Sequence, residues 1–317
     1  MNSRTASTLI SIVIPVYNAE GTIKNLVERI IDEFNKDQSL ELEIVLTNDG
    51  STDRSEEACI NSYNKYKDKV KFISLSKNFG EHNAVMAGLN HVSGEQIVIM
   101  DDDFQNPISE VRKLISFAKN NKFDVVYTYY ESKKHSPFRN LGSWFNDKVA
   151  NVLLNKPRDL YLSSFKWMSR FLVNEVIKYD LPYPYIDGII IRTTNNIGNL
   201  KVAHDSRKFG KSGYSLKKLV SLWSNMFTNF SILPLRFSII IGVIFSGLGM
   251  VIAIIEIIGR ILNPDLPQGY TAIIVAISIF SGVQLIAIGM IGEYVGRIFL
   301  SISRKPQYCI KKIYHSD

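Results

Sequence analysis

Three consecutive carboxylates, Asp101, Asp102 and Asp103, directly follow an apolar segment at residues 97–100. Neighbouring carboxylates repel one another, so the triplet is unfavourable unless a cation neutralises it. In an extended segment Asp101 and Asp103 point to the same side and can share one ion. Hard oxygen ligands with open positions suit Mg²⁺ or Mn²⁺ bound together with a diphosphate. A solvated turn whose aspartates cap a helix near Pro107 is the alternative interpretation.

A second polar turn, Asn-Asp-Gly-Ser-Thr-Asp at residues 48–53, follows another apolar segment. Gly50 permits a tight turn and close backbone approach, and Asp49 can accept hydrogen bonds from a base or a ribose. Asp53 is equally suited to cap the next helix. No Gly-x-Gly-x-x-Gly follows the first apolar segment, so a nicotinamide dinucleotide site is poorly supported.

The elements that must position these turns alternate between strands and helices. Strands are predicted at residues 11–15, 43–47, 70–75, 96–100 and 125–129, and helices at 22–34, 54–66, 81–92 and 108–120. This alternation predicts an α/β fold with a mostly parallel, helix-covered sheet. Such sheets bind ligands at the carboxyl ends of their strands, which is where both polar turns fall.

Composition excludes several other classes of protein. The chain has 317 residues, of which 46% are hydrophobic, and a net charge of +7. This is not a disordered chain, and two cysteines are too few for a disulfide scaffold or a cysteine-based metal cluster. The segment at residues 1–8 is short and polar, and Pro15 interrupts the apolar run at 9–16. We therefore expect no signal peptide and a catalytic part that stays in the cytosol.

The C-terminal part is apolar enough to enter a membrane. Residues 237–255 carry no charge, and residues 271–292 contain Gln284 as their only larger polar side chain. Segments of about 20 such residues can cross the hydrocarbon core, which predicts two spans at about 237–260 and 271–297. Two buried helices of a large soluble core are the alternative. The cations flanking the two segments are Arg236, Arg297, Arg304, Lys305, Lys311 and Lys312. Their positions predict that both termini are cytoplasmic.

Several motifs together resemble a known family. They include Pro-Val-Tyr-Asn at residues 15–18, Asn-Phe-Gly at 78–80, Met-Ala-Gly at 86–88, and the triplet continued by Phe-Gln-Asn-Pro. A basic Gly/Ser loop at 207–215 and short motifs at 234–236 and 292–297 match as well. This order resembles the inverting family-2 glycosyltransferases with a GT-A (Rossmann-like) fold. More narrowly, it is similar to polyprenyl-phosphate glycosyltransferases, which include dolichol-phosphate mannosyltransferase, bactoprenol glucosyltransferases and an undecaprenyl-phosphate 4-deoxy-4-formamido-L-arabinose transferase.

The resemblance implies roles for residues at matching positions. The residues implied to bind the nucleotide are Pro15, Tyr17, Glu20, Asp49, Asp101, Asp102, Lys211 and Ser212. The implied metal ligands are Asp101, Asp103 and Gln105. The implied catalytic residues are Asp101, Asp103 and Arg207. This sequence also departs from the family pattern at Asn48, at Asp102 and at Ser-Ser-Phe-Lys, residues 163–166, where Gly-Asp-Phe-Arg is usual. Lysine in place of arginine keeps the charge but loses the bidentate fork. We expect the pocket around Lys166, Trp167 and Tyr185 to decide the donor sugar.

The resemblance also implies the substrates and the location. The expected donor is a nucleotide-sugar, with UDP as the carrier, and the expected acceptor is undecaprenyl phosphate at the cytoplasmic membrane. The product would be a lipid-linked sugar for cell-envelope glycan modification. Lys133, Lys134 and Arg139 follow the fifth strand and are predicted to hold the lipid phosphate, although a solvated basic loop is the alternative. No nucleic-acid partner is expected, because the basic residues form no separate binding module.

The predicted organisation has four parts. A GT-A domain at 1–213 precedes an amphipathic juxtamembrane helix at 214–235, two membrane helices within 236–300 and a basic tail at 301–317. Core packing is the alternative for the amphipathic segment. Small residues such as Gly242, Gly247 and Gly249 could mediate a homo-oligomer.

Two other functions remain as hypotheses. A processive polysaccharide synthase would have further spans and a Gln-x-x-Arg-Trp motif, neither of which is found in the sequence. A membrane scaffold with a decayed nucleotide site would keep its cellular role after Asp103→Ala.

Overall fold

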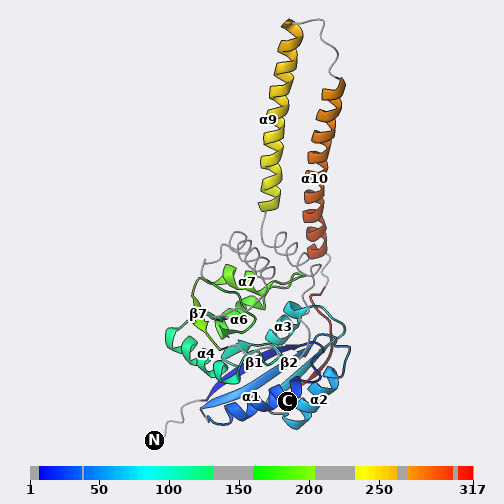
Figure 1. Ribbon diagram of the computed structural model, residues 1–317. Coiled ribbons are helices and arrows are strands. Elements are labelled where there is room, and N and C mark those ends of the chain that lie inside the picture. The colour runs from blue at the N-terminus through cyan, green and yellow to red at the C-terminus, as the bar shows by residue number, and fades with distance from the viewer. Residues whose placement is uncertain are drawn as a thin grey trace. The chain divides into compact units, whose positions relative to one another are not determined.

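The computed structural model describes residues 7–37, 39–130, 160–203, 233–262, 270–302 and 306–316. The chain divides into two compact units. The first comprises Met1–Tyr214 and Lys305–Asp317, and the second comprises Ser215–Arg304. The first unit is an α/β domain, and the second is built from two long apolar helices (Figure 1).

The α/β domain is centred on one sheet that contains eight strands over the described residues. Their order is β7-β5-β6-β4-β1-β2-β3-β8. The strands are β1 (Thr8–Val16), β2 (Leu40–Asn48), β3 (Val70–Leu75), β4 (Gln96–Ile99), β5 (Val125–Tyr129), β6 (Lys166–Ser169), β7 (Ile197–Lys201) and β8 (Ile310–Tyr314). The helices of this domain are α1 (Ile23–Phe34), α2 (Ser55–Lys65), α3 (Glu81–Leu89), α4 (Ile108–Asn121), α6 (Arg170–Val176) and α7 (Ile186–Thr193).

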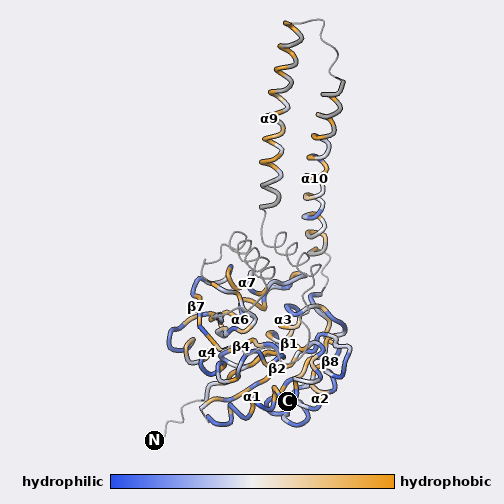
Figure 2. The backbone as a smooth tube through the Cα atoms, in the orientation of Figure 1, coloured by the Kyte–Doolittle hydropathy of each residue, from blue (hydrophilic) through white to orange (hydrophobic). Residues whose placement is uncertain are grey.

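The predicted strands and helices up to residue 129 are confirmed, and their apolar residues form the core. Strands β4, β1, β2 and β3 run parallel, with Val13 opposite both Val45 and Ile99. Helix α1 buries Ile23, Leu26, Val27, Ile30, Ile31 and Phe34, the spacing of one helix face. In Figure 2 hydrophobic segments lie in the strands, and hydrophilic ones lie in the surrounding turns.

Two strands that the sequence analysis did not predict complete the sheet beyond β4. Strand β6 runs antiparallel between β4 and β5, with Lys166 opposite Ile99 and Tyr127. Strand β7 then pairs parallel with β5. Strand β6 has only four residues, which is too short for a clear periodic signal. Its insertion brings residues 163–166 alongside the acidic triplet.

The C-terminal segment, predicted as a basic tail, adds a strand to the sheet. Residues 310–314 form β8, which pairs antiparallel with β3. The Tyr314 ring stacks on Phe72 at 5.4 Å between centroids and contacts Tyr63 at 5.6 Å. An irregularity between Ser74 and Leu75 leaves Lys311 without a register partner, so the segment lacks regular alternation. The predicted basic tail therefore contains a strand for which the sequence analysis gave no signal.

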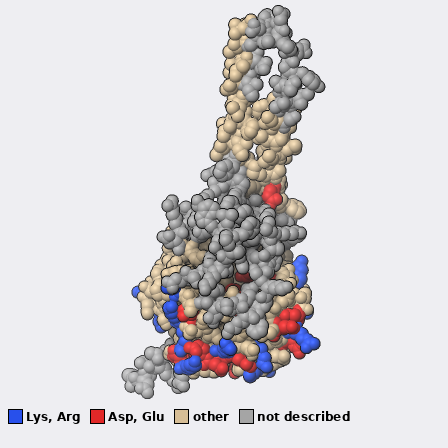
Figure 3. All heavy atoms as spheres, viewed as in Figure 1, with Lys and Arg blue, Asp and Glu red and all other residues tan. Residues whose placement is uncertain are grey.

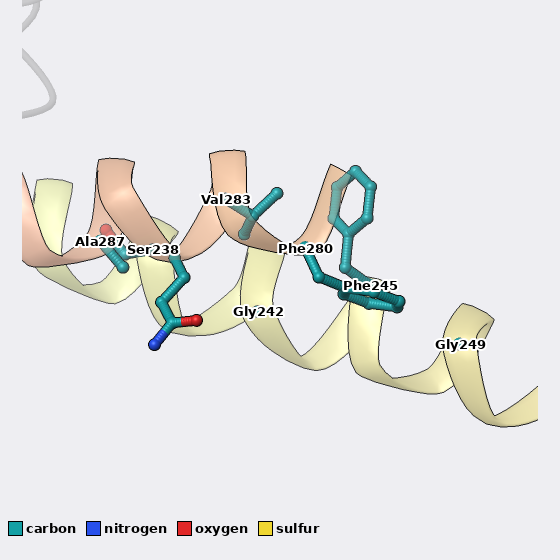
Figure 4. A pocket seen from close by; sticks show the side chains of 8 residues that line it. Ser238, Gly242, Phe245, Gly249, Phe280, Val283 and Ala287 are labelled. Carbon is teal, nitrogen blue, oxygen red and sulfur yellow. The ribbon is translucent and has the colours of Figure 1, made fainter. Parts of the chain in front are cut away.

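The second unit consists of α9 (Leu233–Leu262) and α10 (Tyr270–Ile302), which pack antiparallel. The Ser238 hydroxyl lies 3.1 Å from the Met290 sulfur, and a Cβ added to Gly249 would lie 2.5 Å from the Phe280 ring. A cavity of about 460 Å³ opens between the helices; Figure 4 shows its lining residues. Because Gly249 has no side chain, the Phe280 ring of α10 can approach α9 closely at this position.

One stretch of the described residues, Ile279–Gly296 in α10, is long and apolar enough by composition to cross a membrane. A shorter apolar stretch, Ser238–Val251, lies in α9. Large apolar side chains on both helices are exposed, for example Ile261 at 74% and Ile302 at 73%. Figure 3 shows almost no charge on the described surface of these helices. Of the two predicted membrane spans, the one in α10 is thus supported, and the one in α9 stays a prediction.

Candidate active site

The loop after β1 connects the two polar turns of the sequence at the carboxyl ends of β1, β2 and β4. The Asn18 N–H donates to the Ser51 hydroxyl at 3.0 Å, and the Thr52 N–H donates to the Asn18 side chain at 2.9 Å. The Tyr17 N–H donates to an Asp102 carboxylate oxygen at 3.3 Å, which ties the β1 loop to the triplet. Strands β1 and β4 lie at the point where the strand order reverses, the position where open α/β sheets bind ligands.

Each carboxylate of the triplet has a different surrounding. Asp101 is partly buried and accepts a hydrogen bond from the Ser164 hydroxyl at 2.5 Å. Asp103 is 8% exposed and accepts the Gln105 N–H at 3.1 Å. Phe104 turns the chain in a left-handed conformation at φ 60°, directly after the triplet. Ser164 belongs to residues 163–166, where this sequence departs from the family pattern, so this departure contacts Asp101 directly.

The described residues place an excess of negative charge at the site. Burial raises the pKa of Asp101 to about 7, and the nearby Glu81 carboxylate adds to the increase. Burial also raises the pKa of Asp102 to about 7, with Asp101 and Asp103 contributing by repulsion. The pKa of Glu81, at the start of α3, is raised chiefly by desolvation and then by neighbouring carboxylates. A cation bound at the triplet would relieve this repulsion and favour the ionised carboxylates.

The donor set fits a divalent ion that depends on its substrate for ligands. In the described residues no group of three or more His, Cys, Asp or Glu side chains is arranged to hold a metal by itself. Mg²⁺ and similar ions are often held by one or two carboxylates, with diphosphate oxygens and water completing the shell. Asp101 and Asp103 can supply such carboxylates, since they are close enough for their charges to interact.

Asp49 holds a neighbouring loop in place. It is 3% exposed, and its two oxygens accept the Phe79 N–H at 2.7 Å and the Gly80 N–H at 2.9 Å. Burial raises its pKa, while these two bonds oppose the change. Asp49, which we expected to contact a nucleotide, therefore also holds the backbone that leads into α3. One lone pair on each oxygen is left for a ligand.

The turn at Gly50 gives the first testable prediction. Gly50 has φ +62°, and an added Cβ would lie 2.4 Å from the Lys77 carbonyl carbon and 2.5 Å from the Asn78 nitrogen. Gly50→Ala should lower the free energy of unfolding by about 1–2 kcal/mol from backbone strain alone. Displacement of the neighbouring loop should lower kcat/KM by about 10²-fold. Thermal melting and steady-state kinetics measure the two effects.

Gly21→Ala is the matched control for Gly50→Ala, because nothing lies within 4 Å of the added Cβ and its φ is not in the left-handed region. We expect a change in the free energy of unfolding below about 0.5 kcal/mol for the control. Equal melting temperatures for the two variants would contradict the argument from backbone geometry.

Three further predicted nucleotide-binding residues, Pro15, Tyr17 and Glu20, lie at the same edge of the sheet. Pro15 is in β1 opposite Thr47. The Tyr17 side chain is 47% exposed. Glu20 is exposed and accepts the Arg54 N–H at 3.0 Å. Arg207, Lys211, Ser212, Lys133, Lys134 and Arg139 lie outside the described residues.

The structure adds Glu81, His82 and Asp187, to which the sequence analysis gave no role, and it shows the partner of Lys166. Glu81 and His82 begin α3 beside the triplet, and the His82 ring contacts Tyr185 edge-on at 5.3 Å between centroids. Lys166 forms a buried ion pair with Asp187 at the start of α7. Glu81 and His82 directly follow the Asn-Phe-Gly motif at residues 78–80, and this position could have indicated them as site residues. Asp187 had none, because 21 residues separate it from Lys166.

The fold and the acidic site define a glycosyltransferase of the GT-A type. Glucosyl-3-phosphoglycerate synthase from Mycobacterium tuberculosis, solved with Mn²⁺, UDP and glucosyl-3-phosphoglycerate, shares this fold. The TM-score is 0.54 at 17% identity, over 71% of this chain and 81% of that one. The family model "Glycosyl transferase family 2" matches residues 11–177, and the chain belongs to this family.

Full-length relatives are similar along nearly the whole chain. The undecaprenyl-phosphate 4-deoxy-4-formamido-L-arabinose transferase of Edwardsiella ictaluri is 32% identical, over 97% of this chain and 95% of the relative. The protein of the same name from Photorhabdus laumondii is 31% identical, over 96% of this chain and 94% of the relative. The similarity therefore extends beyond the α/β domain into the apolar C-terminal part.

Proposed function

We propose that this glycosyltransferase moves a sugar from a nucleotide diphosphate, with UDP as the carrier, to undecaprenyl phosphate at the cytoplasmic face of the membrane. The observation that carries the proposal is the acidic triplet at the carboxyl end of β4, hydrogen-bonded to the β1 loop and to Ser164. The names of the relatives supply the class of acceptor. The M. tuberculosis enzyme, which was crystallised with Mn²⁺ and UDP, supports the choice of cofactor and carrier.

The chemistry is a single displacement at the anomeric carbon. A phosphate oxygen of the acceptor forms the new bond to that carbon, and the bond to the nucleotide diphosphate breaks. The departing diphosphate keeps the bonding electron pair. Because a phosphate monoester has a second pKa of about 6, the attacking oxygen is already largely ionised near neutral pH. This acceptor has little need of a general base, and the sugar inverts its configuration.

Two roles then fall to the protein, orientation of the donor and stabilisation of negative charge. Asp101, Asp103 and Gln105 would hold Mg²⁺ or Mn²⁺, which when bound neutralises charge that collects on the diphosphate. Pro15, Tyr17, Glu20, Asp49 and Asp102 would surround the nucleotide. The phosphates of the donor would be contacted by Arg207, Lys211 and Ser212. The phosphate of the lipid would be contacted by Lys133, Lys134 and Arg139.

The acceptor's tail requires the site to stay near the bilayer. We propose that α9 and α10 form a two-span anchor with both termini cytoplasmic. The interfacial helix predicted at 214–235 would precede this anchor; residues 214–232 lie outside the described residues, and α9 includes the last three positions. The exposed apolar side chains of both helices support this, since a contiguous surface of that kind is unfavourable in water. Burial in hydrocarbon would remove that cost.

A donor screen tests the proposal. Purified full-length protein in detergent is incubated with undecaprenyl phosphate, Mn²⁺ and labelled nucleotide-sugars, and organic-extractable, acid-labile product is identified by mass. We expect one sugar per lipid from at least one donor, and no product when undecaprenol replaces its phosphate. Absence of transfer across the donor panel would overturn the proposal. Growth of a polymer would favour the processive synthase instead.

A further inference from the structure

A buried charged pair, Lys166 and Asp187, lies beside the triplet, and Asp187 has no role assigned so far. Lys166, 4% exposed, extends from β6, and Asp187, 7% exposed, is in the first turn of α7. The Lys166 ammonium contacts Asp187 Oδ1, and the Tyr127 hydroxyl donates to the same oxygen at 2.9 Å. The ammonium also lies 5.0 Å from the centroid of the Tyr127 ring. Three elements, β5, β6 and α7, therefore fix this pair.

One face of the pair remains available to a ligand. Both hydrogen bonds end on Oδ1 of Asp187, and Oδ2 accepts none from the residues that the structure describes. The fully buried side-chain atoms without a partner in this part of the chain are Thr47 Oγ1 and Asn83 Oδ1. Asp187 Oδ2 is not among them, and 10% of the Asp187 side-chain surface remains exposed. A lysine ammonium has three donors, and Asp187 uses one.

The pair is adjacent to the place proposed for the diphosphate. Ser164, two residues before Lys166, donates to Asp101. His82, at the start of α3, packs against Tyr185, two residues before Asp187. In the sheet, β6 and β1 lie on opposite sides of β4, which carries the triplet at its end. A nucleotide-sugar has its nucleoside and its sugar at opposite ends of the diphosphate. With the nucleoside over the β1 and β2 loops, the sugar lies over β6.

We infer that Lys166 and Asp187 form the donor-sugar subsite, in which Asp187 Oδ2 accepts a hydrogen bond from one ring hydroxyl and Lys166 donates to a neighbouring one. The inference rests on the proposed function and refines its substrate class. A donor and an acceptor held side by side match two adjacent free hydroxyls of a sugar ring. A sugar that lacks one of them leaves a polar group without a partner, so the site should discriminate against deoxy analogues.

The test variant is Asp187→Asn, which keeps the shape of the side chain and removes its charge. We measure UDP affinity by calorimetry, and kcat/KM for the preferred UDP-sugar and for its deoxy analogues. The expected result is an unchanged affinity for UDP, within about 2-fold, and a loss of at least about 100-fold in kcat/KM for the preferred donor. The preference over the relevant deoxy analogue should shrink to below about 10-fold, because the hydrogen bond that discriminates is gone.

Lys71→Met is the matched control, since it breaks the Lys71–Glu43 ion pair, 2.7 Å long, in the same domain. It should lower the melting temperature without changing donor preference. If Asp187→Asn does not fold, Tyr127→Phe takes its place, because it removes only the hydroxyl that holds Oδ1. An equal loss for the preferred donor and every deoxy analogue, or a matching loss of UDP affinity, would overturn the subsite. Failure of the wild-type protein to transfer any sugar would instead overturn the proposed function.

Discussion

Asp103→Asn should lower kcat by at least about 10³-fold while the protein remains folded. Asp103 is the more buried of the two proposed metal-holding carboxylates, at 8% exposure. Asparagine keeps an oxygen that can accept the Gln105 N–H, so the local turn should survive. The substitution removes one charge from the group that would hold the cation. Labelled sugar transfer under saturating donor, together with thermal melting, measures both effects.

Asp37→Asn is the control for Asp103→Asn. Asp37 pairs with Arg112 at 2.6 Å in a partly exposed position and has no predicted role in the site. Activity within about 2-fold of the wild type is expected, because exposed ion pairs contribute little. Retention of more than a tenth of the activity by Asp103→Asn would contradict the assignment. If the cellular phenotype also survived, the scaffold hypothesis would gain support.

Chelation of divalent ions should abolish transfer, with a loss of about 10³-fold that Mn²⁺ or Mg²⁺ reverses. Burial raises the pKa values of Asp101 and Asp102 to about 7, and repulsion from neighbouring carboxylates adds to the increase. Without a cation, a diphosphate brought to the triplet would meet only repulsion from these carboxylates. The measurement is transfer after EDTA treatment and after re-addition of each ion.

The same experiment has a readout that does not depend on turnover. Mn²⁺ together with UDP should raise the melting temperature of the wild-type protein, because both would bind the folded state. The increase should be absent in Asp103→Asn and present in Asp37→Asn. Full activity in EDTA, or an equal thermal shift in Asp103→Asn, would contradict a metal at the triplet.

Most of the structural features that could be predicted depend on short stretches of neighbouring residues. The Ile- and Val-rich segments of β1, β2 and β4 bury their side chains on both faces, so each reads as a strand by itself. The polar turns after β1, β2 and β4 had to share one sheet edge once the strands ran parallel. The hydrogen bond between the Tyr17 N–H and Asp102 joins two such turns across 85 residues.

Other features had no local signal. The expectation that Asp49 faces a nucleotide could not include the Phe79 and Gly80 amides, because those contacts form only after β3 joins β2. The Lys166–Asp187 pair depends on β6 entering antiparallel between β4 and β5 and on the position of α7.

Local patterns in the chain specify the α/β alternation, the apolar C-terminal helices and the place of the acidic triplet, because hydrophobic periodicity and turn residues act over a few neighbours. Only contacts across the folded sheet place β8 at its edge, Ser164 against Asp101 and Asp187 against Lys166. These contacts join residues far apart in the chain, and their partners are selected by strand order and packing.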